Sequence, residues 1–121
     1  MRFPADLTHL ASVRDFAADA ARDLGATVDP DDLALIVGEL AANAARHQEG
    51  EIELVIRVHA DGSADIEVVD GDPTIPEPVL SEPSDPAGHR GLHLVSAISH
   101  SWGVSPEGDG KRIWARLSPA R

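Results

Sequence analysis

Two polar residues four positions apart are the first candidates for chemistry in this sequence. Glu39 and Asn43 fall within an apolar, helix-like run, so both side chains would lie on the same helix face and contact the same bound ligand. An amide oxygen suits Mg2+, which takes few protein ligands and fills its shell with phosphate oxygens and water. Glu39 would then orient or deprotonate an attacking hydroxyl. On spacing alone, an ordinary solvated Glu–Asn pair beside Arg46 is the simpler interpretation.

Two further segments carry groups suited to a nucleotide. Asp70 follows Val68-Val69 and enters a turn, where its carboxylate would accept the exocyclic amino proton of a purine, although Asp is also common in turns. The segment Gly88-His89-Arg90-Gly91 precedes a helical pattern, so its amides and Arg90 would meet a phosphate group. Taken by itself, a plain turn before a helix explains that segment.

Helical spacing of apolar residues predicts three helices that position these groups. The first covers residues 8–24 and ends at Gly25, and the third starts near Gly91. The second runs from Pro30 to about residue 47, with Asp29 as its N-cap. Its core-facing residues are expected to be Leu33, Val37, Leu40 and Ala44.

Alternating apolar residues predict two hairpins and a short strand near Phe3. Asp61-Gly62 would join strands 51–59 and 64–69, and a Gly-Asp-Gly turn would join strands 101–104 and 112–117. Aromatic residues are scarce, and the two tryptophans, Trp102 and Trp114, are expected in the core. The proline-rich stretch between Asp70 and Gly91 cannot form a regular element, and we expect it to act as a mobile cover over a binding site.

Length and composition favour one globular domain. The chain has 121 residues, of which 42% are hydrophobic and 26% charged. A formal net charge of -11 would repel a nucleic-acid backbone, and no cluster of Lys and Arg offsets it. The chain has no cysteine, which excludes disulfides and thiolate metal sites and fits a cytoplasmic protein. No apolar run suits a signal peptide or a membrane span.

Three motifs, taken in chain order, resemble one family. They are Glu39-Leu40-Ala41-Ala42-Asn43-Ala44-Ala45-Arg46-His47, then Val68-Val69-Asp70 followed by Pro73, and Gly88 through Val95. The sequence resembles the GHKL ATP-binding superfamily, and most of all its bacterial anti-sigma-factor serine/threonine kinases. The endings Trp102-Gly103-Val104 and Gly110-Lys111-Arg112-Ile113-Trp114 also resemble the bacterial kinase-like branch, so the similarity spans almost the whole chain.

The resemblance implies an α+β fold, a two-layer α/β sandwich of about three helices on one face of a mostly antiparallel sheet of four to five strands. It implies one ATP-binding domain over residues 1–121, with residues 71–90 as the ATP lid. By motif match, Glu39 is the general base, Asn43 holds Mg2+ and Asp70 recognises adenine. The other implied cofactor-binding residues are Arg46, His47, Gly88, His89, Arg90, Gly91 and Leu92.

The resemblance also implies partners. Kinases of this branch transfer the γ-phosphate of ATP to a serine on a small antagonist protein and sequester a sigma factor, and a homodimer is plausible by analogy. This sequence departs from the family where glycines are frequent, with Asp72, Thr74, His89 and His93 at those positions. Fewer flexible amides would lower ATP affinity or turnover. The alternative is therefore an interaction module, nucleotide-binding or nucleotide-free, that sequesters a regulator without phosphoryl transfer.

Overall fold

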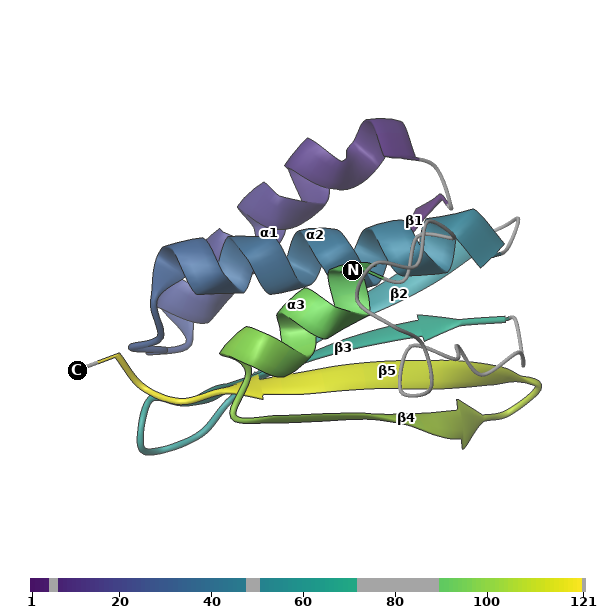
Figure 1. The fold of residues 1–121 in the computed structure, drawn as a ribbon. Coiled ribbons are helices and arrows are strands. Elements are labelled where there is room, and N and C mark those ends of the chain that lie inside the picture. Colours follow the sequence, from purple (N-terminus) through teal and green to yellow (C-terminus); the bar gives the residue numbers. More distant parts are fainter. Residues whose placement is uncertain (5–6, 48–50, 72–89, 121) are drawn as a thin grey trace.

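The computed structural model describes residues 1–4, 7–47, 51–71 and 90–120. Within these ranges the chain forms a five-stranded antiparallel sheet with helices packed on one face (Figure 1). The expected two-layer α+β sandwich is thereby confirmed. In chain order the elements are β1 (Arg2–Pro4), the 3-10 turn η1 (Leu7–His9), α1 (Leu10–Asp23), α2 (Pro30–His47), β2 (Glu51–Val58), β3 (Ala64–Asp70), α3 (Arg90–Ile98), β4 (Ser101–Glu107) and β5 (Gly110–Leu117).

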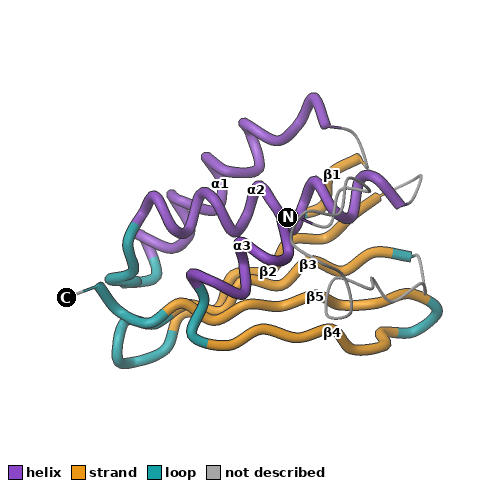
Figure 2. Tube along the Cα trace, in the orientation of Figure 1, coloured by secondary structure: helices purple, strands orange, loops and turns teal. Residues whose placement is uncertain are grey.

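Helix α2 is the central helix of the helical layer. Oδ1 of Asp29 accepts the N–H groups of Asp31 and Asp32 at 2.8 and 3.2 Å, which caps the first turn as predicted. The helix contacts α1 and α3 in its own layer and β2, β3 and β5 below it (Figure 2). Its predicted core-facing residues Leu33, Val37, Leu40 and Ala44 are buried as expected, and Ile36 and Ala41 are buried as well. No helix in the described ranges is long and apolar enough to cross a membrane.

The sheet has the strand order β1-β2-β3-β5-β4, so β1 and β4 are its edges. Both edge strands contain a proline, Pro4 in β1 and Pro106 in β4. The second hairpin is longer than predicted, because β4 pairs with β5 as far as the register Glu107↔Gly110. Pro106 interrupts the sequence pattern there, but an edge strand tolerates the loss of one N–H group.

The turn between β2 and β3 is tied to the connection between α1 and α2. Gly62 has φ +90, and its carbonyl accepts the N–H of Thr27 at 2.9 Å. A Cβ atom at Gly62 would lie 2.1 Å from Oγ1 of Thr27. The carbonyl of Thr27 in turn accepts the N–H of Ala120 at 2.7 Å. Glycine at position 62 thus allows three chain segments to meet closely.

The face of the sheet opposite the helices carries charged side chains. The buried carboxylate of Glu67 lies between two guanidinium groups, from Arg57 and from Arg112, the latter at 2.7 Å. Trp114 shares this face with them and is half-buried, so the expectation that it lies in the core is wrong. Successive residues of a strand point to opposite faces, and the buried Ile113 places its neighbour outside.

A second charged group on the same face surrounds Asp65. Its Oδ1 and Oδ2 accept hydrogen bonds from Nε and Nη2 of Arg116 at 2.7 and 3.1 Å, and Nε2 of His59 lies 2.8 Å from Oδ2. The hydrogen bonds from Arg116, and then that from His59, hold the pKa of Asp65 below its usual value although partial burial opposes this.

Candidate functional site

Asn43 is an enclosed amide on the C-terminal half of α2. Its residue is 3% exposed, and its Oδ1 is buried and accepts no hydrogen bond from the residues that the structure describes. An amide oxygen buried without a donor costs about 1–3 kcal/mol. The atom therefore suits a hard cation or a donor group of a bound molecule. The predicted partner Glu39 lies one turn earlier and is half-buried, so it can reach a ligand and solvent.

Asp70 ends β3, as predicted, and its carboxylate is held by a residue of β5. Nζ of Lys111 donates a hydrogen bond to Oδ1 of Asp70 at 3.1 Å, and both side chains are 0% exposed. The two residues are direct partners in the β3–β5 register. A carboxylate accepts several hydrogen bonds, and Lys111 supplies one of them here.

Gly110 brings the start of β5 against the backbone of Asp70. A Cβ atom at this glycine would lie 1.8 Å from the Asp70 carbonyl oxygen and 2.8 Å from Cα of Gly71. Neither atom belongs to a flexible side chain, so a larger residue would displace the backbone itself. The position of Asp70 is therefore fixed both by the ion pair and by this close packing.

These residues lie at one end of the molecule. The C-terminal half of α2, the end of β3 and the start of β5 lie toward the same side, and α2 contacts both strands (Figure 1). The structure thus brings Asn43 and Asp70, which are far apart in sequence, to the same end of the helix–sheet sandwich.

The other predicted binding residues are placed only in part. Arg46 and His47 fall in the last turn of α2, and Arg90, Gly91 and Leu92 fall in the first turn of α3, which begins one residue earlier than expected. Their side chains lie outside what the structure describes, as do Gly88 and His89 entirely. Of the predicted lid at 71–90, residues 72–89 lie outside the described ranges, so the lid stays a prediction.

Lys111 is the residue of this region that the sequence reasoning missed. The motif that contains it gave it no role. The signal lies in the alternation of β5, because Lys111, Ile113, Ala115 and Leu117 share one face and all are buried. A lysine in phase with three apolar core residues indicates a buried charge that needs a partner.

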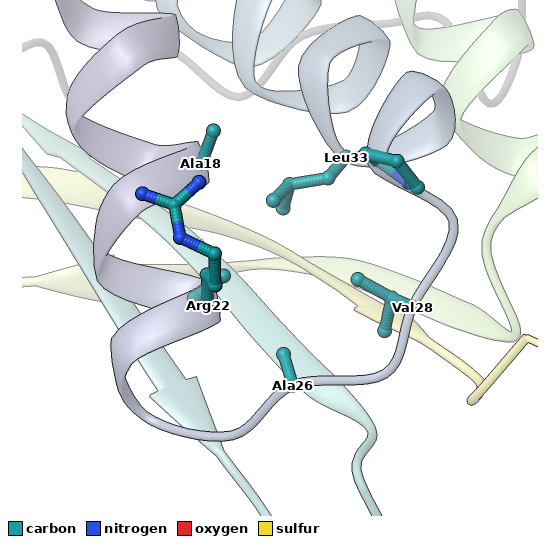
Figure 3. A pocket seen from close by; sticks show the side chains of 7 residues that line it. Ala18, Arg22, Ala26, Val28 and Leu33 are labelled. Carbon is teal, nitrogen blue, oxygen red and sulfur yellow. The ribbon is translucent and has the colours of Figure 1, made fainter.

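A separate hollow of about 300 Å³ lies at the other end of α2 (Figure 3). Ala18 and Arg22 of α1 border it, opposite Val28 and Leu33. Leu33 precedes Asn43 by ten residues, which is about 15 Å along a helix axis. This distance separates the hollow from the candidate site, and the lining of the hollow is mainly apolar.

A comparison with protein families identifies the domain. Residues 3–117 match the family model of the histidine kinase-like ATPase domain. The chain belongs to this family. Membership of the histidine kinase-like ATPase family implies ATP binding, and it confirms the superfamily that the motifs indicated. No curated protein matches the sequence.

Solved histidine kinases share the fold of this histidine kinase-like ATPase domain. The catalytic domain of histidine kinase ThkA gives a TM-score of 0.62 at 14% identity, over 99% of this chain and 98% of that one. The mycobacterial sensor histidine kinase MprB gives 0.57 at 17% identity, over 99% and 100%. The blue-light activated histidine kinase of Erythrobacter litoralis EL346 gives 0.56 at 18% identity, and 91% of this chain spans 40% of that one.

Proposed function

We propose that this domain is an ATP-dependent serine/threonine protein kinase of the anti-sigma-factor type. Its phosphate acceptor would be a small antagonist protein, and its second partner a sigma factor. The observation that supports the proposal is the pair on α2, in which the enclosed Asn43 has an unsatisfied Oδ1 among the described residues and Glu39 one turn away stays partly exposed. Membership of the histidine kinase-like ATPase family supports ATP as the nucleotide.

Each residue of the pair has a distinct role in this proposal. ATP supplies the γ-phosphoryl group that is passed to the acceptor serine. Oδ1 of Asn43 would bind Mg2+, which needs only one or two protein ligands beside phosphate oxygens. The carboxylate of Glu39 would accept the proton that the serine hydroxyl loses. Asp70 would accept the amino proton of the adenine base.

Calorimetry with ATP tests the role of Asn43. Asn43→Ala should weaken ATP binding about 10–100-fold in the presence of Mg2+, because one metal ligand is lost, and much less in EDTA. Ser63→Ala is a suitable control, since it removes a buried polar group in the β2–β3 turn, outside the candidate site. Equal losses with Mg2+ and with EDTA would contradict a metal-binding role.

Phosphoryl transfer to candidate antagonist proteins tests the kinase activity. With labelled ATP and Mg2+, Glu39→Gln should lower the transfer rate by about 100-fold or more while ATP binding is retained. Glu107→Gln, the same change at an exposed position of β4, should leave the rate unchanged. No labelled protein, with Glu39→Gln identical to the wild type, would count against the proposal.

One observation favours the alternative function. The Asp70 side chain, which would have to reach a base, is 0% exposed and paired with Lys111. An interaction module that sequesters a regulator without phosphoryl transfer needs no open base site. Failure of the wild-type protein to bind ATP or ADP in calorimetry would support this alternative over the kinase.

A further inference from the structure

The ion pair between Lys111 and Asp70 is the most enclosed charged group among the described residues. Nζ of Lys111 lies 3.1 Å from Oδ1 of Asp70, and neither side chain is exposed. Lys111 is also the only lysine of the chain. Its placement on the core face of β5, beside apolar neighbours, is therefore a specific feature of this end of the sheet.

A contribution to fold stability does not explain such a buried ion pair well. Removing two charges from water costs several kcal/mol per ion, and replacing a buried pair by apolar residues of similar volume is often neutral or stabilising. A pair that contributes little net stability is better explained by what it does to Asp70. Gly110 supports this, because its close approach fixes the Asp70 backbone while Lys111 fixes the carboxylate.

We propose that Lys111 is a positioning residue for base selection. Its ammonium group holds the Asp70 carboxylate as an oriented acceptor, so that the site selects a purine with an amino group at C6 over one with a carbonyl there. The inference rests on the proposed ATP-binding function and assigns to Lys111 the specificity of that same site.

The selection follows from hydrogen-bond chemistry. An ionised carboxylate only accepts hydrogen bonds, so it matches the C6 amino group of adenine and opposes the C6 carbonyl of hypoxanthine or guanine. Lys111 holds Oδ1 of Asp70 and so fixes the orientation of the carboxylate. Without Lys111 the carboxylate could rotate, and the aligned acceptor for the C6 amino group would be lost. The variant would therefore distinguish the two kinds of purine less well.

The test is the ratio of the affinities for ATP and for inosine triphosphate, which differ in the C6 group. Calorimetry on the wild type, Lys111→Met and Lys111→Arg should give a wild-type preference for ATP of at least about tenfold. The ratio should fall to within about threefold in Lys111→Met and return toward the wild-type value in Lys111→Arg. Thermal unfolding of each variant checks that it is folded.

A purely structural role for Lys111 gives a different result. Lys111→Met would then weaken both nucleotides by one factor and leave the ratio unchanged, which would overturn the inference. A wild type that binds both nucleotides equally would overturn it as well, while the proposed ATP-binding function would stand. A wild type that binds neither would overturn both proposals.

A measurement on the wild type applies even if Lys111→Met does not fold. Because the chain has one lysine, selective 15N labelling of lysine gives a single side-chain ammonium signal. ATP should shift this signal, whereas inorganic tripolyphosphate, which has no base, should leave it in place. Equal shifts with ATP and with tripolyphosphate would show that Lys111 does not respond to the base, and would refute the inference.

Discussion

Replacing Gly110 with alanine tests the packing that holds Asp70 at the end of β3. The new Cβ atom would lie 1.8 Å from the Asp70 carbonyl oxygen, and Cβ contacts under 3.0 Å essentially do not occur. Relief requires a backbone movement of about 1.2 Å. That is about a quarter of the spacing between neighbouring strands, and it would stretch a hydrogen bond of about 2.9 Å well beyond its useful range.

The expected destabilisation is about 2–4 kcal/mol. Overpacking alone costs about 1–3 kcal/mol, and distortion of the buried ion pair next to Gly110 adds to it. Gly108→Ala is a matched control in the same hairpin. That glycine has φ +58, and no atom lies within 4 Å of the position that a Cβ atom would take, which leaves a backbone cost of about 1 kcal/mol.

Urea unfolding followed by the fluorescence of the two tryptophans measures both variants. We expect Gly110→Ala to lose clearly more stability than Gly108→Ala, and to lose ATP affinity in addition, since Asp70 moves with its backbone. A Gly110→Ala protein within about 0.5 kcal/mol of the wild type would refute the close approach of β5 to Asp70.

Two further outcomes follow from other contacts. Gly62→Ala should lower the free energy of unfolding by about 2–4 kcal/mol, because it combines φ +90 with a 2.1 Å clash against Thr27. Gly25→Ala is the control in the same urea assay: that glycine also has φ +90 but lies in open space, so the loss should be about 1–2 kcal/mol. Asp65 has a lowered pKa through Arg116, so its stabilising effect is present above the unfolded value of about 4 and is lost as the pH falls through the folded value. The stability difference between wild type and Asp65→Asn should therefore shrink below about pH 4, and a difference independent of pH would contradict this pairing.

The fold was largely predictable because local signals and the tertiary structure agree. The Asp29 cap, the apolar stripe of α2 and the Asp-Gly turn after β2 each specify one element, and all three occur as expected. Trp114 was misplaced because its apolar character was weighed above its phase in β5. The buried Ile113 next to it shows that alternation decides which face a residue occupies.

The candidate site was predictable to a smaller extent. Motif order identified Asn43 and Asp70, and the structure places them at the same end of the sandwich. The alternation of β5 indicates that Lys111 is buried, but its partner Asp70 lies 41 residues away in sequence and is identified only by the β3–β5 register. The predicted contacts of Gly88 and His89 stay predictions.

The prolines of the two edge strands limit how copies of this domain can associate. Pro4 and Pro106 each lack the N–H group that a neighbouring chain would need for an unbroken ladder. Extension of the sheet from one molecule into the next is therefore disfavoured at both ends. Among the described residues, the helix surfaces and the charged face around Trp114 are the surfaces that this leaves for a contact between copies, and crosslinks placed there would test for a homodimer.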